Sequence, residues 1–180
     1  MEPRTLILFP TEAEAAPFIE RCGRGQCVIS GVGMAATAAA LARLLPTLTP
    51  GDTLLLAGVA GAYGNRARIG EVVEVESERE AELPERFRMT YRPSKPISSL
   101  RRVASNTVHG KGAEAGDAAI ENMEGATFMA VCAAAGIACA EIRAVSNRVG
   151  EPFAEWHFDE AAERLADALA EIAAKHKSNK

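Results

Sequence analysis

Two acidic side chains, Glu121 and Glu124, stand three residues apart near the start of the stretch 119–147. That spacing places both on one face of a helix, and a glutamate in a helix's first turn is stabilised by the positive end of the helix dipole. An apolar helical segment at 127–135 and a second apolar segment at 137–145 follow, and the stretch ends in the polar pair Ser146-Asn147. Polar residues that end a buried strand occupy the edge where open α/β sheets bind ligands. The pattern indicates either a ligand site built on carboxylates or a simple helix cap with a solvated Glu124.

A third acidic residue, Glu14, follows the first predicted strand. Residues 5–9 are typical of a short apolar strand, Pro10-Thr11 ends it, and a helical stretch begins at Glu12. Thr11 and Glu14 have the spacing of a capping box, which would give Glu14 a purely structural role. The alternative is that a carboxylate just beyond the strand faces the crevice at the sheet edge.

Glycine-rich stretches follow the next two predicted strands, at 27–30 and 53–57. Residues 31–36 match the dinucleotide-binding pattern Gly-x-Gly-x-x-Ala, but the strand at 53–57 has no acidic residue at its end to hold a ribose hydroxyl. We therefore interpret these glycines as a tight turn before a helix at 34–45. The continuous apolar strand 53–57 predicts burial on both faces of a sheet, and the glycines of 58–64 predict a turn whose backbone approaches a ligand closely.

The rest of the chain continues this alternation of strands and helices. A charged stretch at 76–85 predicts an exposed loop or strand end, 100–107 predicts a strand, and 111–117 a short glycine-rich connection. Apolar residues recur at helical spacing over 159–175, which predicts a final amphipathic helix. The sequence shows no internal repeat and no low-complexity linker, so we expect one α/β domain over residues 1–180.

Composition narrows the class of protein. The chain has 180 residues, of which 48% are hydrophobic, enough for one core of useful size. Its formal net charge is −4 with both signs scattered, which argues against a nucleic-acid surface. No stretch approaches the length of a membrane span, and the first residues lead directly into a strand-like run. We expect a cytoplasmic protein that binds neither nucleic acid nor membrane.

A metal site is not expected. The four cysteines, Cys22, Cys27, Cys132 and Cys139, lack metal-ligand spacing, and the three histidines are widely spread. Cys132 and Cys139 stand among apolar residues, where free cysteine packs as a small hydrophobic residue. The cysteine usage is that of a reduced compartment.

The motif Glu-Asn-Met-Glu-Gly-Ala at 121–126, followed by Arg-Ala-Val-Ser-Asn at 143–147, resembles the superfamily of nucleoside phosphorylases and methylthioadenosine nucleosidases, and within it the futalosine hydrolases. Residues 68–75 also resemble a strand of this superfamily, and the likeness extends from Leu6 to about Trp156. The resemblance implies a three-layer α/β/α fold with a mixed, mostly parallel central sheet. It also implies a small-molecule nucleoside substrate, no cofactor, and a homodimer or higher homo-oligomer.

The resemblance further implies a role for each candidate residue. Cleavage of an N-ribosidic bond passes through an oxocarbenium-like sugar and needs a carboxylate that deprotonates water. Glu14 takes this catalytic role, Glu124 binds the ribose hydroxyls, and Met123 forms an apolar wall against the ribose. The remaining members of the expected site are Asn122, backbone contacts from Ala60 and Gly61, Val108 against the base, and Asn147 facing the purine as a second catalytic residue.

Asn147 bears on which purine is released. Adenosine-type nucleosidases carry Asp at the corresponding position. A 6-oxopurine offers two acceptors, O6 and N7, and an Asn amide nitrogen carries two donor hydrogens, so Asn147 favours hypoxanthine over adenine. The implied reaction is hydrolysis of futalosine to hypoxanthine and dehypoxanthine futalosine, in an alternative route to menaquinone.

Other functions stay open at this stage. The phosphate-binding motif Gly-Asp-Pro-x-Arg of the phosphorylases is absent, since residues 9–12 are Phe-Pro-Thr-Glu, so water is the favoured nucleophile. An adenosine-type nucleosidase or a nucleoside phosphorylase is the enzymatic alternative. A catalytically inactive nucleoside-binding protein is the alternative of another class, suggested by Asn147 and the short middle region.

Overall fold

The computed structural model of the chain describes residues 3–110 and 114–178, so part of the predicted connection 111–117 lies outside the described residues. One sheet runs through these residues in the order β2-β1-β3-β6-β5-β4-β7, with β7 also paired to β3. Its strands are β1 (Thr5–Phe9), β2 (Cys27–Ile29), β3 (Thr53–Ala62), β4 (Val72–Glu80), β5 (Arg102–Thr107), β6 (Ile120–Asn122) and β7 (Ala138–Arg148).

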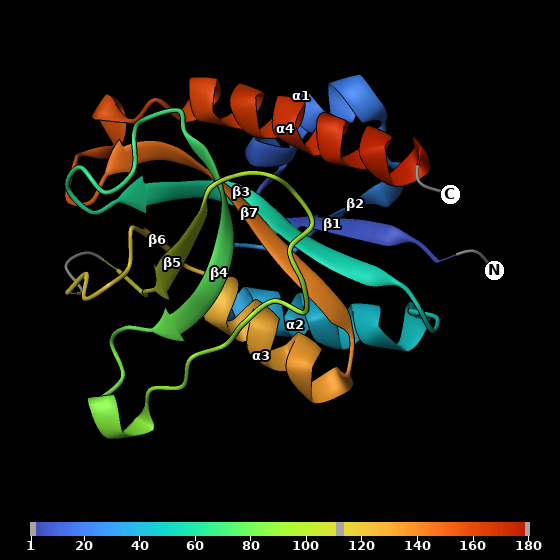
Figure 1. The fold of residues 1–180 in the computed structure, drawn as a ribbon, viewed down its shortest axis with the longest axis horizontal. Coiled ribbons are helices and arrows are strands. Elements are labelled where there is room, and N and C mark those ends of the chain that lie inside the picture. The colour runs from blue at the N-terminus through green and yellow to red at the C-terminus, as the bar shows by residue number, and fades with distance from the viewer. Residues whose placement is uncertain (1–2, 111–113, 179–180) are drawn as a thin grey trace.

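The strand pairings close part of the sheet into a ring. Because β3 pairs with both β6 and β7, the order β3-β6-β5-β4-β7 returns to β3. Parallel pairing dominates, as in β1 with β3 and β3 with β7, whereas β6 on β3 and β4 on β7 are antiparallel. Figure 1 shows the long strands β3 and β7 side by side through the centre of the molecule. The predicted mixed, mostly parallel sheet is confirmed.

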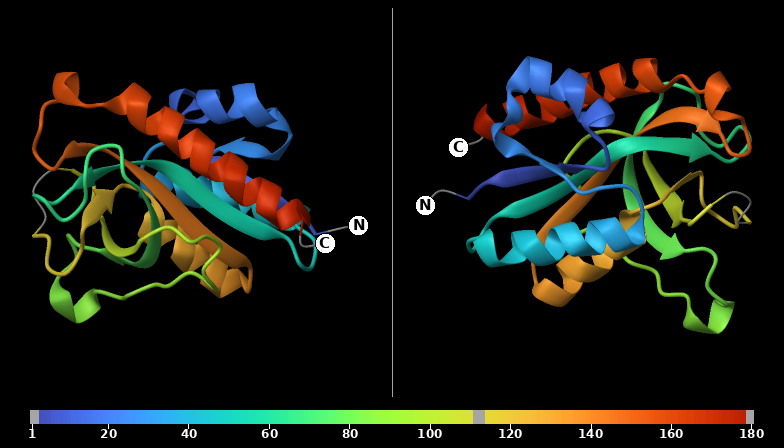
Figure 2. Two further views of the ribbon diagram at one scale, coloured as in Figure 1. Left: turned by 45° about the horizontal axis from the view of Figure 1, so that its top comes forward. Right: turned by 180° about the vertical axis from the view of Figure 1, so that it is seen from behind.

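Helices cover both faces of this sheet (Figures 1 and 2). The pair α1 (Glu12–Cys22) and α4 (Phe158–Ser178) lies on one side, and the pair α2 (Met34–Leu44) and α3 (Gly125–Ala135) lies on the other. Short 3₁₀ turns link the elements: η1 (Arg24–Gln26), η2 (Leu45–Thr47), η3 (Glu85–Phe87) and η4 (Phe153–Glu155). The predicted three-layer arrangement is confirmed. None of the described helices has the length and apolar character needed to cross a bilayer.

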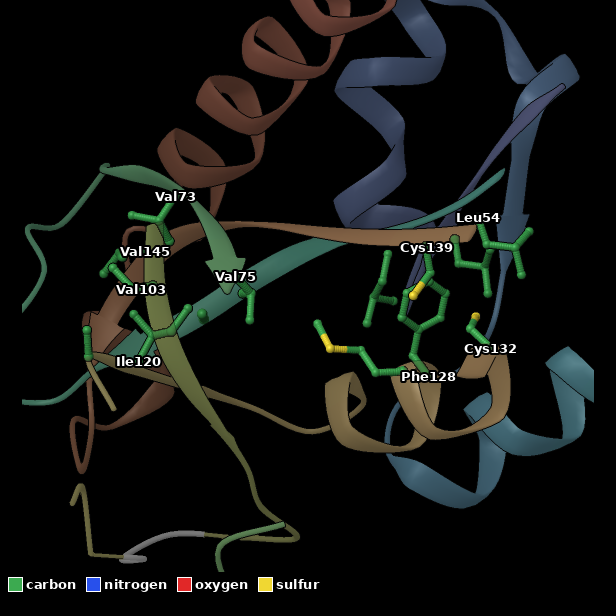
Figure 3. Packing of buried hydrophobic residues seen from close by; sticks show 14 of the residues in the cluster. Leu54, Val73, Val75, Val103, Ile120, Phe128, Cys132, Cys139 and Val145 are labelled. Carbon is green, nitrogen blue, oxygen red and sulfur yellow. The ribbon is translucent and has the colours of Figure 1, made fainter. Parts of the chain in front are cut away.

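The sheet separates two hydrophobic clusters. Alternate residues of β7 supply both, since Ala140 and Ile142 face α1 and α4, whereas Cys139 and Val145 face α2 and α3. Figure 3 shows the second cluster, where Phe128 of α3 lies near Cys139 while Val145 and Ile120 meet inside the ring of strands. Burial of apolar surface on both faces explains why the central strands are continuous apolar runs.

The glycine-rich turn predicted at 58–64 is wrong, because β3 continues as a strand to Ala62. Its backbone pairs with β7 as far as Ala62↔Arg148 and with β6 through Gly61↔Glu121. Glycine weakens a strand but is accepted where a neighbour approaches closely. At Gly58 an added Cβ would lie 2.6 Å from Nη1 of Arg143, so the strand needs a residue without a side chain there.

Two acidic stretches also differ from expectation. Glu121 does not share a helix with Glu124: it lies in β6, and α3 begins at Gly125 with Glu124 at the N-cap position. The segment 76–85, predicted as an exposed loop or strand end, does contain the end of β4 at Glu80, but Glu78 within it is completely buried. In both places partners on other strands outweigh the local charge pattern.

Candidate active site

Arg143 on β7 is the centre of a buried polar cluster. Its side chain is fully buried. Nε donates to Oε1 of Glu141 at 2.7 Å, and Nη2 donates to Oδ1 of Asn122 at 3.0 Å and to Oε2 of Glu124 at 3.2 Å. A buried guanidinium is tolerated only when its donors are satisfied and its charge is balanced. These bonds therefore fix the geometry of Glu124 and Asn122 around one cation.

Glu124 is held from two sides. Its Oε1 accepts from the backbone N–H of Gly33 at 2.9 Å, and its backbone N–H donates to Oδ1 of Asn122 at 2.8 Å. Gly33 has φ +87° and caps α2, a conformation that favours glycine. The tight turn predicted for residues 31–36 thus exists, and it delivers a main-chain donor to the carboxylate. The expectation of a solvated Glu124 is wrong, because the residue is only 3% exposed.

Glu14 takes part in the cap of α1, and its carboxylate is also buried. Thr11 caps α1 by accepting from the backbone N–H of Glu14 at 3.2 Å, as the capping-box spacing predicts. The Glu14 carboxylate is also buried, with Oε1 accepting from the N–H of Val59 at 2.9 Å and Oε2 from the hydroxyl of Thr11 at 2.7 Å. Glu14 and Arg143 are neighbours across Gly58, where an added Cβ would lie 2.8 Å from Oε1 of Glu14 and 2.6 Å from Nη1 of Arg143.

The surroundings of Glu14 shift the pKa of its carboxyl group. Burial raises its pKa above the ordinary value, and this effect outweighs the hydrogen bonds from Thr11 and Val59 and the charge of Arg143. A carboxylate with a raised pKa is a stronger base near neutral pH. Among the described residues no cluster of three or more His, Cys, Asp or Glu side chains is arranged to hold a metal ion. What these residues offer is acid–base chemistry beside a fixed cation.

The contact at Gly58 makes a direct prediction. Gly58→Ala places a methyl group between Glu14 and Arg143, so we expect at least a tenfold loss of turnover and a loss of about 1–3 kcal/mol in the free energy of unfolding. Chemical denaturation and steady-state kinetics would measure both. Gly25→Ala is the matched control, because an added Cβ there meets nothing within 4 Å. Equal behaviour of the two variants would contradict the close approach.

Asn147 lies outside the Arg143 cluster. The register between β3 and β7 shifts between Ala60 and Gly61, and such a bulge re-aims the side chains that follow it. Beyond the bulge, Nδ2 of Asn147 lies beside Gly61, 3.2 Å from the position of an added Cβ. Along β7, Asn147 is four residues from Arg143, roughly 13 Å at the rise of a strand.

The hydrogen bonds of Asn147 fix which way its amide points. Its Oδ1 accepts from the hydroxyl of Ser146 at 2.8 Å, and its Nδ2 donates to the carbonyl oxygen of Arg148 at 2.9 Å. One amide hydrogen is thereby left for a ligand, whereas two were counted from the residue type alone.

The other predicted binding residues lie around these two centres. Ala60 and Gly61 are in β3, after Gly58, and Gly61 pairs with Asn147 of β7. Val108 is buried just after β5 and donates its backbone N–H to the carbonyl oxygen of Asn122 at 2.9 Å. Met123 stands between Asn122 and Glu124 and is partly buried. The structure thus brings Glu14, Asn122 and Glu124 together around Arg143, with Asn147 further along β7.

Sequence reasoning missed three members of the cluster: Arg143, Glu141 and Glu78. A usable signal existed for two of them, because Glu141 and Arg143 interrupt the apolar segment 137–145 at alternate positions of a strand. Charges at that spacing face the same side of the sheet, so they indicate a buried ion pair. Glu78 stands among other charged residues and gave no such signal.

Comparison with known proteins places this chain in a family. Residues 105–175 match the phosphorylase superfamily. Among solved structures, 5'-methylthioadenosine/S-adenosylhomocysteine nucleosidase from Helicobacter pylori has a TM-score of 0.82 at 14% identity, covering 97% of this chain and 99% of that one. The futalosine hydrolase of Helicobacter pylori strain 26695 has a TM-score of 0.82 at 14% identity, and the match covers 96% of this chain and 98% of that one. The fold is therefore that of the phosphorylase superfamily.

A curated relative gives the closer assignment. Futalosine hydrolase from Thermus thermophilus is 32% identical in an alignment that covers 94% of this chain and 95% of the relative. The chain belongs to the futalosine hydrolase family, and with it to the nucleosidase enzymes of the phosphorylase superfamily.

Proposed function

We propose that this enzyme hydrolyses the N-ribosidic bond of futalosine and releases hypoxanthine and dehypoxanthine futalosine. The observation that carries the proposal is the buried cluster in which Glu14 and Glu124 flank Arg143, within a chain of the futalosine hydrolase family. In this proposal Glu14 is the carboxylate base and Glu124 the carboxylate that accepts hydrogen bonds from hydroxyls, while Arg143 is a cation that binds Glu124 and lies near Glu14.

In the proposed reaction Glu14 removes a proton from the attacking water as the bond between ribose and purine breaks. The sugar acquires positive charge in this step, and hydrogen bonds from the ribose hydroxyls to Glu124 strengthen as that charge develops. Glu124 keeps lone pairs for such bonds, because each of its oxygens accepts one bond from the protein, from Gly33 or from Arg143. The purine leaves with the electron pair of the broken bond and takes up a proton.

The choice of purine rests on Asn147. Its amide oxygen is already bound by the Ser146 hydroxyl, so the side chain presents an N–H donor to a ligand. A 6-oxopurine offers acceptors at O6 and N7, whereas the exocyclic amine of adenine needs an acceptor. This orientation supports hypoxanthine as the released base.

The proposal includes the setting of the reaction. We place the enzyme in the cytoplasm, in an alternative menaquinone route that uses this substrate, as a single domain without cofactor that assembles into a homodimer or higher homo-oligomer. The four cysteines are free, in keeping with a reduced compartment.

A substrate panel tests the proposal. The purified enzyme is incubated in turn with futalosine, aminofutalosine, inosine and methylthioadenosine, with and without phosphate, and the products are separated by chromatography. We expect hypoxanthine from futalosine with the highest kcat/KM and no dependence on phosphate. Release of adenine would indicate the adenosine-type activity, a ribose 1-phosphate product would indicate phosphorolysis, and binding without turnover would indicate an inactive relative.

Asn147→Asp extends the panel to specificity. A carboxyl group at this position accepts from an exocyclic amine, so we expect the ratio of kcat/KM for futalosine over aminofutalosine to fall by about tenfold or more. An unchanged ratio would remove Asn147 from purine recognition.

A further inference from the structure

A second pair of carboxyl groups, Glu78 on β4 and Glu141 on β7, lies behind Arg143 and takes no direct part in the reaction above. Both side chains are fully buried. A Cβ added to Gly125 would lie 2.5 Å from Oε1 of Glu78 and 2.7 Å from Oε2 of Glu141, so the two carboxyl groups approach each other beside this glycine. Ionised carboxylates only accept hydrogen bonds, so two carboxyl groups that face each other in a buried site can bond only when one of them carries a proton.

The remaining bonds show where that proton resides. Oε1 of Glu141 accepts from Nε of Arg143 at 2.7 Å, which favours the ionised form of Glu141. Without a proton from Glu78, Oε2 of Glu141 has no hydrogen-bond donor among the described residues. Glu78 accepts from Thr107 Oγ1 at 2.7 Å with Oε2 and from Asn122 Nδ2 with Oε1. A proton on Oε1 of Glu78 satisfies the buried oxygen of Glu141 and leaves these other bonds in place.

We propose that Glu78 and Glu141 share one proton and together position the active site, and that loss of this proton switches the enzyme off. Glu141 orients the guanidinium of Arg143 through Nε, while Glu78 orients the amide of Asn122. That amide binds Arg143 and accepts from the N–H groups of Glu124 and Gly125 at 2.8 and 2.7 Å. The role for turnover rests on the proposed function, because it acts through Arg143 and Glu124.

The pair is built to lose its proton on the alkaline side of neutrality. Burial, together with the charge of Glu141, raises the pKa of Glu78 to about 8. Above this pH the proton passes to solvent, and two negative charges then face each other beside Glu124, with Arg143 as the nearby cation. Like charges at such distance in a buried site repel strongly, so the Asn122 and Arg143 side chains move from their bonded positions.

Few other ionisable groups face the pair. From β7 these are Arg143 and Cys139, and from the N-cap position of α3 it is Glu124. The polar side chains from β5 and β6 are neutral: Ser105, Thr107 and Asn122.

Glu141→Gln is the decisive variant. A glutamine places its oxygen on Nε of Arg143 and its NH2 group on Oε1 of Glu78, so the hydrogen bonds and the single negative charge of the pair are kept while the titrating proton is removed. For the wild type, kcat is expected to fall as pH rises through about 8. In Glu141→Gln we expect this alkaline decline to disappear, because Glu78 is then ionised over the whole range and accepts from the new NH2 group. Glu141→Leu, which keeps neither bond, loses far more activity than Glu141→Gln at every pH.

Glu78→Gln is expected to lose the activity that Glu141→Gln retains. An amide donates and accepts on different atoms, so a glutamine that donates to Glu141 turns an NH2 group toward the NH2 group of Asn122. We expect its kcat to fall at least tenfold even at pH 6.5, and Glu76→Gln, on the same strand but partly exposed, to retain the wild-type profile with its alkaline decline. Cys139→Ala keeps the decline too, because the thiol is not the titrating group.

Thermal unfolding separates this inference from the proposed function, since it needs no substrate. Between the pKa of a free glutamate and about 8 the Glu78–Glu141 pair holds one more proton in the native wild type than in the unfolded chain, so the pair makes the Tm fall as pH rises. The Tm of Glu141→Gln falls less over the same range. Parallel Tm curves, or an alkaline decline of kcat that is unchanged in Glu141→Gln, would overturn the shared proton. If no substrate of the panel is hydrolysed but the Tm curves of the wild type and Glu141→Gln differ, only the proposed reaction is rejected and the shared proton stands.

Discussion

Arg143→Met is expected to lower the free energy of unfolding at pH 8 by about 3–5 kcal/mol and to abolish turnover. Methionine fills a similar volume without charge, so the packing is largely kept while Glu124 and Glu141 lose the cation that both contact. Removing one partner of a buried ion pair leaves the other charge without compensation, and here two carboxylates are affected. Urea unfolding at pH 8, with hypoxanthine release measured in parallel, gives both quantities.

Two comparisons make this result specific. Arg101→Met removes an ion pair with Glu71 whose arginine side chain is 49% exposed, and a surface pair of this kind contributes at most about 1 kcal/mol. Arg143→Lys keeps the charge but cannot reach Glu141, Asn122 and Glu124 at once, so its stability is expected between those of the wild type and Arg143→Met. The stability loss of Arg143→Met should shrink as pH falls, because burial raises the pKa of Glu141 and a protonated Glu141 no longer needs the cation. A loss equal to that of Arg101→Met would contradict the central position of Arg143.

Local patterns of the sequence predicted most of the helices and the outer strands. The apolar run 5–9, the Thr11 cap and the glycine turn before α2 each depend on neighbours within a few residues, and each is confirmed. The amphipathic period over 159–175 likewise identified α4. These features succeed because their partners are close in the chain.

The errors have one physical origin, which is pairing over long sequence separations. The glycines after residue 57 are typical of a turn, yet β3 continues because β6 and β7 satisfy its backbone on both sides. Glu121 stands at helical spacing from Glu124, yet it lies in β6, paired with β3 and β5. A strand that closes a ring takes its structure from partners that no local window contains.

The candidate site was also predicted in part, again where a residue's position depends on neighbours that are close in the chain. Glu14, which follows β1, and Glu124, which belongs to the motif at 121–126, both lie in the cluster around Arg143. Both were predictable because they stand at the ends of elements that the sequence indicates. The charges behind them come from β4 and β7. Their burial depends on Thr107, Asn122 and Gly125 from three further elements, so the charge of Glu78 alone could only suggest exposure.

Glu14→Gln is expected to lower kcat by about 10²- to 10⁴-fold while leaving the affinity for hypoxanthine close to that of the wild type. Glutamine has nearly the shape of glutamate and can keep the bonds to Thr11 and the N–H of Val59, but it cannot take a proton from water. Steady-state release of hypoxanthine and calorimetric titration with hypoxanthine measure the two effects. Glu12→Gln is the matched control, because Glu12 lies in the same helical turn but is exposed and pairs with Arg24.

The pH dependence gives this substitution a second, independent signature. Burial raises the pKa of Glu14, and only its ionised form accepts a proton, so wild-type kcat should fall as pH decreases through that raised pKa. Glu14→Gln should lack this acidic decline. The native state also holds the Glu14 proton at a pH where the unfolded chain has lost it, so this residue costs stability as pH rises. The Tm of Glu14→Gln at pH 8 should therefore not lie below that of the wild type, so that lost turnover with a retained Tm identifies a chemical role. A kcat indistinguishable from wild type would place the base elsewhere.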